Sequence, residues 1–312
     1  MRRLACLLSI AVLVGSAVPQ DRQGGTRFDF IAPVNLGPQV NSPVFDGGPS
    51  ISTDGLTLFF TSKRPGGSGG GDLWVTRRAK LTDPFGTPQN LGTAVNSPAN
   101  EFAPSISADG LSIYFDSDRP GGLGLSDIWV AMRATTSDPF GTPQNLGPPV
   151  NSTASDGLPN ISADRLSLYF CSRRPGGFGQ MDLWVARRRT RSGPFAEAQN
   201  LGPGINSQYD DWGPSISADG LNLFLMSSRP GGQGGEDIWF ATRAKVSDAF
   251  RSPRNLGAMV NSPALDARPN ISADGLTLFF MSDRMGGSGQ IDLWQASNRG
   301  QLRQRKSVGR IK

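Results

Sequence analysis

Histidine is absent from all 312 residues of this chain, and cysteine is nearly absent, with only Cys6 and Cys171. The lack of histidine excludes Ser-His-Asp and Cys-His catalysis and every histidine-ligated metal site. Long hydrophobic runs are also missing, apart from one short run near the N-terminus. These absences exclude several large classes of enzyme and any comfortable membrane span.

The first 17 residues have the three-part pattern of a secretory signal peptide. Arg2 and Arg3 precede an apolar run over residues 4–14, and small residues follow up to Ala17. We therefore expect an exported protein, periplasmic or secreted, with residues 18–27 as a short linker. Cleavage would leave Cys171 as the only thiol, so that packing rather than a disulfide must hold the fold.

The net charge of +5 is unevenly distributed along the chain. Residues 299–312 hold six basic residues and no acidic one; with this tail and the two N-terminal arginines set aside, 23 basic residues face 26 acidic ones. A basic tail can contact nucleic acid or anionic surfaces. A short solvated end is the commoner explanation, and we predict no nucleic-acid partner for an exported protein.

A period of 55 residues aligns the chain with itself five times without a gap. The positions in register include a proline, an aspartate, an arginine and a tryptophan of each unit: Pro49, Pro104, Pro159, Pro214 and Pro269; Asp54, Asp109, Asp164, Asp219 and Asp274; Arg64, Arg119, Arg174, Arg229 and Arg284; Trp74, Trp129, Trp184, Trp239 and Trp294. A fixed period of this length is typical of propellers, solenoids and arrays.

Each unit is predicted to contain four strands. In the second unit, residues 104–107 and 111–117 are expected to pair through an Asp-Gly turn. A Gly-rich hairpin loop then leads to a strand over 127–133, and a longer connection reaches an outer segment over 145–152. Because no stretch shows helical periodicity, the predicted class is all-β.

The ends of the chain indicate a closed ring. The fifth unit lacks the outer segment "PQNLGxxVNS", whereas the N-terminal segment carries its residues one period ahead of the first unit: Phe30, Pro33, Asn35, Leu36, Gly37, Asn41 and Ser42. If this segment joins the last sheet as its outer strand, both vulnerable sheet edges are paired. The sequence thus predicts one five-bladed β-propeller over residues 28–298.

The repeated string "PSISADGLxLFFxSxRPGGxGxxDLW" resembles the WD-repeat-like propeller repeat of TolB-type bacterial periplasmic proteins. The resemblance covers roughly residues 28–298. It implies an exported bacterial β-propeller. Members of this group include protein-binding modules, propeller domains attached to peptidases and exported proteins of unknown role, so the resemblance leaves the activity open.

Most of the repeated residues are interpreted as structural. The five tryptophans are expected to fill the gaps between neighbouring blades. The five arginines are expected to bond loop carbonyls or a nearby carboxylate, such as the aspartate of "DLW". The aspartate of "SADG" is expected to cap its own turn; one copy reads Asp164-Arg165, so Arg165 must adopt a positive φ or a different turn.

One carboxylate of each unit is placed three residues before the predicted inner strand: Asp46, Glu101, Asp156, Asp211 and Asp266. If inner strands line a central channel, these five groups converge at one mouth, where they would raise one another's pKa unless a cation intervened. Calcium is a natural occupant of such a ring. The alternative is that each carboxylate caps its own loop. No other cofactor is predicted.

Residues that recognise a specific ligand are expected where one unit departs from the repeated pattern. Trp212 and Phe102 occupy a position that other units fill with Gly or Ala, and Tyr209 is close by in sequence. Aromatic faces beside carboxylates suit sugar rings. The two larger side chains can equally plug the channel.

Two functions from different classes follow. The leading hypothesis is a non-catalytic exported propeller that binds a protein or glycan partner through loops at one mouth of the channel. The alternative is a glycoside hydrolase of the five-bladed arabinanase type, with Glu101 as the acid and Asp46 together with Asp156 or Asp211 as base and modulator. Because identical carboxylates make poor acid and base partners, the first hypothesis is favoured.

Overall fold

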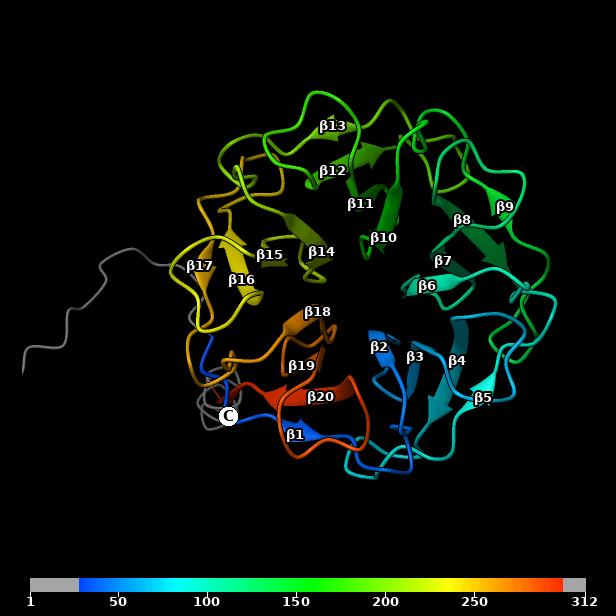
Figure 1. Ribbon diagram of the computed structural model, residues 1–312. Helices are drawn as coiled ribbons and strands as arrows, with labels where there is room; N and C mark the ends of the chain where they lie inside the picture. The colour runs from blue at the N-terminus through cyan, green and yellow to red at the C-terminus, as the bar shows by residue number, and fades with distance from the viewer. Residues whose placement is uncertain (1–27, 300–312) are drawn as a thin grey trace, which may run out of the picture.

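Five four-stranded antiparallel sheets form a ring around a central axis, so the predicted five-bladed β-propeller is confirmed (Figure 1). The computed structural model describes residues 28–299. The predicted signal peptide (1–17), the linker (18–27) and the basic tail beyond Arg299 lie outside the described residues. Within residues 28–299, no helix has the length and apolarity needed to cross a membrane.

Each blade runs from the axis outward through an inner strand, two further long strands and a two-residue outer strand. Blade 1 contains β2 (Asp46–Ile51), β3 (Thr57–Ser62), β4 (Asp72–Arg77) and β5 (Gln89–Asn90); blade 2 contains β6 (Glu101–Ile106), β7 (Ser112–Ser117), β8 (Asp127–Met132) and β9 (Gln144–Asn145). Blade 3 contains β10 (Asp156–Ile161), β11 (Ser167–Ser172), β12 (Asp182–Arg187) and β13 (Gln199–Asn200); blade 4 contains β14 (Asp211–Ile216), β15 (Asn222–Ser227), β16 (Asp237–Thr242) and β17 (Arg254–Asn255). Blade 5 contains β18 (Asp266–Ile271), β19 (Thr277–Ser282), β20 (Asp292–Ser297) and β1 (Val34–Asn35).

The strands differ from the predicted ranges at two places. The inner strand of blade 2 begins at Glu101, three residues early, because Glu101 already pairs with Ser117 on the next strand. The outer strand is limited to Gln144–Asn145, since the Asn145 side chain accepts the backbone N–H of Gly147 and the chain turns away there. The carboxylates placed before the inner strands are therefore their first residues.

The N-terminal segment closes the ring as predicted. β1 pairs with β20, with Val34 opposite Gln295 and Asn35 opposite Trp294. The outer strand of blade 1 has the same register against its own third strand, because Asn90 lies opposite Trp74. Figure 1 shows the blue β1 beside the red β20. The last sheet consequently has the same four-stranded structure as the others, and neither end of the repeat leaves an unpaired edge.

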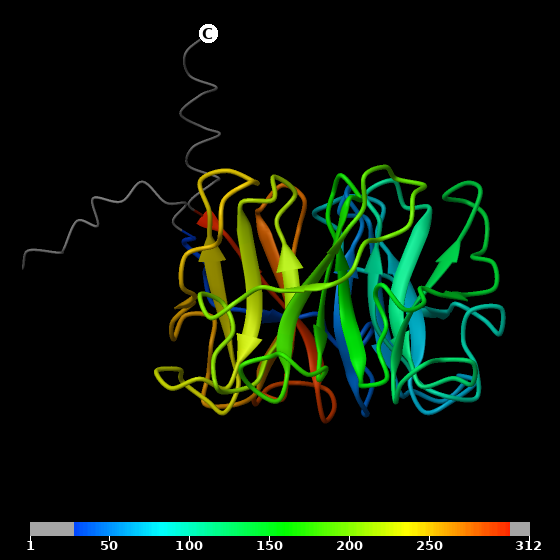
Figure 2. The same ribbon diagram turned by 90° about the horizontal axis from the view of Figure 1, so that it is seen from above.

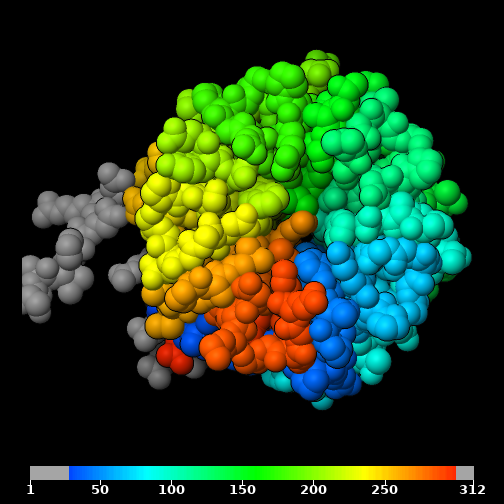
Figure 3. All heavy atoms as spheres, viewed as in Figure 1, coloured from blue at the N-terminus to red at the C-terminus, as the bar shows by residue number. Residues whose placement is uncertain are grey.

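The hydrophobic core lies between adjacent sheets, which stand side by side in Figure 2 and are in contact all the way round the ring in Figure 3. Trp74 of blade 1, for example, shares a buried cluster with Phe279 and Leu293 of blade 5. Trp184 shares one with Tyr114 of blade 2. All five repeated tryptophans are 7% exposed, as expected for rings that fill the space between blades.

A closed belt of five hydrogen bonds joins the inner strands. In each blade the backbone N–H of the isoleucine of "PSI" or "PNI" donates to the Ser or Asn side chain of the preceding blade: Ile51 to Asn270, Ile106 to Ser50, Ile161 to Ser105, Ile216 to Asn160 and Ile271 to Ser215. The bond from Ile51 to Asn270 spans the junction between the first and last blades. The belt therefore encircles the whole axis.

Each inner strand also carries a bulge directly before its proline. The strand register shifts there, and the residue before the proline has a positive φ in every blade: Gly48, Ala103, Leu158, Gly213 and Arg268. Glycine is the usual residue for this conformation. Three blades nevertheless place a side chain at the bulge, and all five bulge residues line the axis.

Candidate binding site at the channel mouth

The five repeated carboxylates are locked inside their own blades. Asp46 is fully buried; one oxygen accepts hydrogen bonds from the backbone and hydroxyl of Ser42, and the other accepts from Nη2 of Arg64 at 2.6 Å. The same Arg64 nitrogen also donates to the carbonyl oxygen of Val40 at 2.6 Å. The other four pairs are Arg119–Glu101, Arg174–Asp156, Arg229–Asp211 and Arg284–Asp266.

This arrangement gives each carboxylate a cation of its own. Within residues 28–299, no group of three or more Asp, Glu, Cys or His side chains is placed to hold a metal ion. The ring of convergent carboxylates expected for calcium is therefore not formed. Glu101, the acid candidate from the sequence, is fully buried; burial raises its pKa, and hydrogen bonds from Ser97 and the charge of Arg119 oppose that rise.

The arginines bond to a different carboxylate from the one named in the sequence prediction. The aspartate of "DIW" in blade 2, Asp127, instead accepts hydrogen bonds from the backbone N–H of Leu123 at 2.6 Å and from the side-chain amide of Asn145 at 2.8 Å. It thereby ties the Gly-rich loop to the outer strand. Arg119 bonds the inner-strand carboxylate of Glu101 and the carbonyl oxygen of Val95 instead.

A cavity of about 270 Å³ opens at the end of the ring where the inner strands begin. Its walls include Phe102 on β6, Trp212 on β14 and Arg268 on β18. Asp116 on β7 and the nearby Asp118 add carboxyl groups. The two aromatic residues singled out in the sequence therefore come together in one cavity, whereas Tyr209 is not among its lining residues.

The two aromatic residues differ in their surroundings. Phe102 makes an edge contact with Phe45, with ring centroids 6.2 Å apart, and the amino group of Lys63 lies 5.8 Å from its ring centroid. Trp212 packs against the buried cluster of Met226, and its indole nitrogen is buried without a hydrogen-bond partner. The Trp212 ring is thus held by its apolar neighbours while its polar atom stays unsatisfied.

Arg268 is the functional candidate that the sequence prediction missed. It occupies the bulge position of blade 5 with φ of +53°. Its Nη1 atom is buried without a hydrogen-bond partner. Burial lowers the pKa of Arg268, and the charges of Asp116 and Glu236 counteract that effect. Comparing the residue before each repeated proline would have found Arg268, because the other four blades have only Gly, Ala or Leu there.

Two carboxyl groups near Arg268 are also perturbed. Burial raises the pKa of Asp116 to about 6, although Arg268 and the backbone N–H of Leu158, which donates to its Oδ1 at 2.9 Å, oppose the rise. Burial and the charge of Asp210 raise the pKa of Glu236. Asp116 lines the cavity, and a group with a perturbed pKa in a cavity is typical of functional sites.

No protein-family model matches the chain, and no curated protein matches it. Solved structures similar to it include a GH43_1 enzyme from Xanthomonas citri complexed with xylotriose, at 16% identity and a TM-score of 0.56, covering 86% of this chain and 90% of that one. An alpha-L-arabinofuranosidase from Lactobacillus brevis is similar at 15% identity and a TM-score of 0.54, with 85% and 94% covered.

TolB from Acinetobacter baumannii is similar at 15% identity and a TM-score of 0.52; the match covers 81% of this chain and 55% of TolB, about half its length. These identities are low enough that the likeness concerns the fold alone. The chain is thus similar in fold both to TolB-type propellers and to glycosidase propellers, and the choice between binding and hydrolysis must be argued from its own residues.

Proposed function

We propose that the protein is a non-catalytic binding propeller that takes its partner, a glycan or a protein, at the mouth cavity beside Trp212. One observation carries this proposal. All five repeated carboxylates, including Glu101, are fully buried and paired with arginine. A carboxylate held in that way can neither reach a glycosidic oxygen nor activate water.

A glycan end suits the mouth cavity best. The faces of Trp212 and Phe102 offer apolar area for the C–H face of a sugar ring, and Asp116, Asp118 and Arg268 offer acceptors and donors for hydroxyl groups. Ligand sites commonly combine mostly apolar walls with a few placed polar groups.

Thermal unfolding of the purified protein against a panel of neutral and acidic glycans tests this proposal. A ligand that binds only the folded state raises the midpoint in a concentration-dependent way. We expect Trp212→Ala to abolish the shift and Phe178→Ala, an exposed aromatic change outside the cavity, to preserve it. If no glycan shifts the midpoint, pull-downs with the same two variants test whether a protein partner binds at the cavity. Partner binding that Trp212→Ala leaves unchanged would overturn the proposed site.

A glycoside hydrolase is the second candidate, because two observations favour it. The fold is shared with glycosidase propellers, and two carboxyl groups that interact electrostatically with Arg268 have raised pKa values: Asp116 in the cavity wall and Glu236. An acid with a raised pKa is what glycoside cleavage needs. Turnover of aryl glycosides that disappears in Asp116→Asn or Glu236→Gln, with the fold intact, would replace the binding proposal by this one.

Export of the chain belongs to the same proposal. The signal peptide predicted over residues 1–17 would deliver the propeller to the periplasm or the medium, which suits a module that meets envelope or external glycans. N-terminal sequencing of the protein recovered from each cell fraction checks it. We expect the chain to begin near residue 18 outside the cytoplasm; an uncut chain in the cytoplasm would contradict export.

A further inference from the structure

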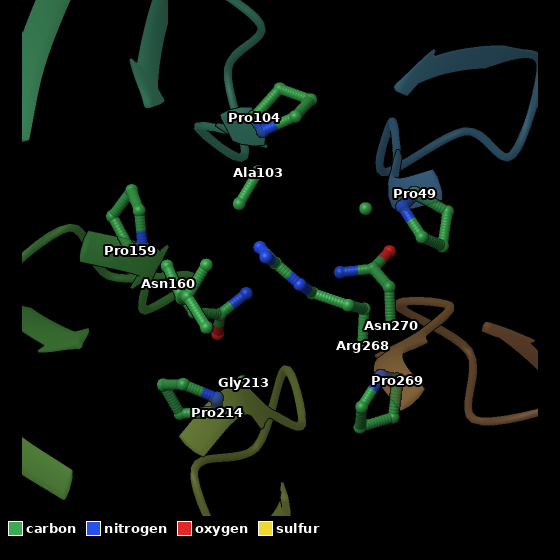
Figure 4. Close-up of a pocket in the computed structure, with 12 residues that line it drawn as sticks. Pro49, Ala103, Pro104, Pro159, Asn160, Gly213, Pro214, Arg268, Pro269 and Asn270 are labelled. Atoms are coloured by element: carbon green, nitrogen blue, oxygen red, sulfur yellow. The ribbon is translucent and has the colours of Figure 1, made fainter. Parts of the chain in front are cut away.

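A small void lies on the axis, between the bulges and the hydrogen-bonded belt. It has a volume of about 20 Å³, and the side chains around it are apolar except for Asn160, Arg268 and Asn270. Figure 4 shows the Arg268 side chain reaching across the axis from blade 5 toward Ala103 of blade 2. The side-chain nitrogens of Asn160 and Asn270 are turned toward it.

The orientation of both amides is fixed by the belt. Oδ1 of Asn160 accepts the backbone N–H of Ile216 at 2.9 Å, and Oδ1 of Asn270 accepts that of Ile51 at 2.9 Å. Each Nδ2 group therefore faces the void. A flipped amide would turn its NH₂ group toward the N–H of the isoleucine, so that a donor would face a donor. The three blades without asparagine have serine at this position, whose hydroxyl accepts the equivalent bond.

Arg268 brings a positive charge to the same place. Its Nη1 atom is buried without a hydrogen-bond partner, and no carboxylate lines the void. Asp116 and Glu236 attract its charge through space, yet neither forms an ion pair with it in the described part of the chain. A buried guanidinium nitrogen left without an acceptor is costly, so an acceptor is expected.

We propose that this void binds a single monatomic anion of chloride size, held by the guanidinium of Arg268 and the amide groups of Asn160 and Asn270. The volume corresponds to about one water-sized sphere, which is enough for a halide ion. Three donor groups and a positive charge select an anion over a cation. The bound ion would tie blade 5 to blade 3 across the axis and neutralise the charge of Arg268. A bound ion of this sign is the opposite of the calcium that the sequence analysis considered for the repeated carboxylates.

Bromide is the probe for the test, since it resembles chloride and scatters X-rays anomalously. We expect crystals of the full chain grown in bromide to show an anomalous peak between Arg268 and the two amides. In solution, replacing gluconate by chloride at constant ionic strength should raise the unfolding midpoint with increasing concentration. A water molecule at the site, or a crystal peak without any chloride-specific shift in solution, would overturn the proposal.

Two variants remove donors without disturbing the fold. Arg268→Gly places at the bulge the residue that blades 1 and 4 already have, and Asn160→Ser places in the belt the residue of blade 1. We expect Arg268→Gly to lose the chloride-specific shift and Asn160→Ser to weaken chloride affinity by about tenfold. Ala103→Gly is the matched control at the equivalent bulge and should retain the shift. A shift retained by Arg268→Gly would show that the anion binds elsewhere.

Discussion

The repeated contacts within the blades and the residues at the bulges on the axis follow opposite rules. In every blade the same arginine meets the first residue of the inner strand, Asp or Glu, and the same tryptophan fills the same gap between sheets. At the axis, the two positions before the repeated proline differ from blade to blade and include Trp212 and Arg268. Fivefold repetition therefore indicates a structural role, and a single departure from it indicates a candidate site.

The physical reason lies in the ring itself. A repeated residue of this kind contacts only its own blade and a neighbouring one, so each of the five copies has the same environment. A side chain at the axis shares its space with four others, and one large residue is enough to fill it. Arg268 can reach across the axis because the bulges facing it have only Gly, Ala or Leu.

The largest expected effect comes from breaking one of the repeated arginine–carboxylate pairs. Asp156→Ala leaves the buried guanidinium of Arg174 without its carboxylate, and we expect it to lower the free energy of unfolding by about 3–5 kcal/mol. Asp156→Glu is the matched control, because Glu101 fills the same position in blade 2. Chemical denaturation measures both. Equal stabilities for Asp156→Ala and the unaltered protein would show that the repeated pairs are dispensable.

A smaller effect is expected from titrating Asp116 at the axis. Its pKa is raised to about 6 in the folded state from 3.8, so between these values the native state binds a proton that the unfolded state has released. The free energy of unfolding should therefore fall as the pH rises from 4 to 6. Asp116→Asn removes this pH-dependent loss. The free energy of unfolding of the variant, taken relative to that of the unaltered protein, should therefore be higher at pH 7.5 than at pH 4 by on the order of 2–3 kcal/mol.

Denaturation curves for both proteins across this pH range measure that difference directly. Asparagine keeps an Oδ1 acceptor for the backbone N–H of Leu158, so the local structure should survive the change. Parallel stability profiles for the two proteins would contradict a strained carboxylate at Asp116.

The smallest expected effect concerns the turn between the two inner strands of blade 3. Arg165 has φ of +64° in a turn where the other four blades have glycine. Arg165→Gly should relieve about 1 kcal/mol of backbone strain, and the loss of the exposed ion pair with Asp109 offsets a few tenths of that gain. We expect a slightly higher unfolding midpoint. A clear decrease would mean that the Arg165–Asp109 pair joins blades 2 and 3 as strongly as a buried contact.

The architecture could be predicted because it depends on spacing. The 55-residue period, the missing outer strand of the last unit and its presence before the first unit were sufficient for five blades and for the closure through β1. The partner of each repeated arginine was harder to predict. Three carboxylates recur in each blade, and only the fold decides that Asp46 faces Arg64 while Asp72 caps the Gly-rich loop.

The candidate site shows the same limit. Phe102 and Trp212 stood out in the sequence as departures from the repeat, and the fold places them in one cavity. Arg268 stood out less, because an arginine in a loop-rich chain is ordinary until a positive φ and a bulge direct it to the axis. Its unsatisfied nitrogen exists only in three dimensions.

By itself, the sequence determined the number of blades, their order and how the ring closes, because a gapless repeat allows each unit only one kind of neighbour. The tertiary structure decided which charges meet. Antiparallel pairing of the inner strand with the next strand brings each repeated carboxylate to the arginine 18 positions later in the same blade, whereas the bulge of blade 5 places Arg268 on the axis without a carboxylate of its own. The strand register decides these contacts, and the residue pattern alone does not specify it.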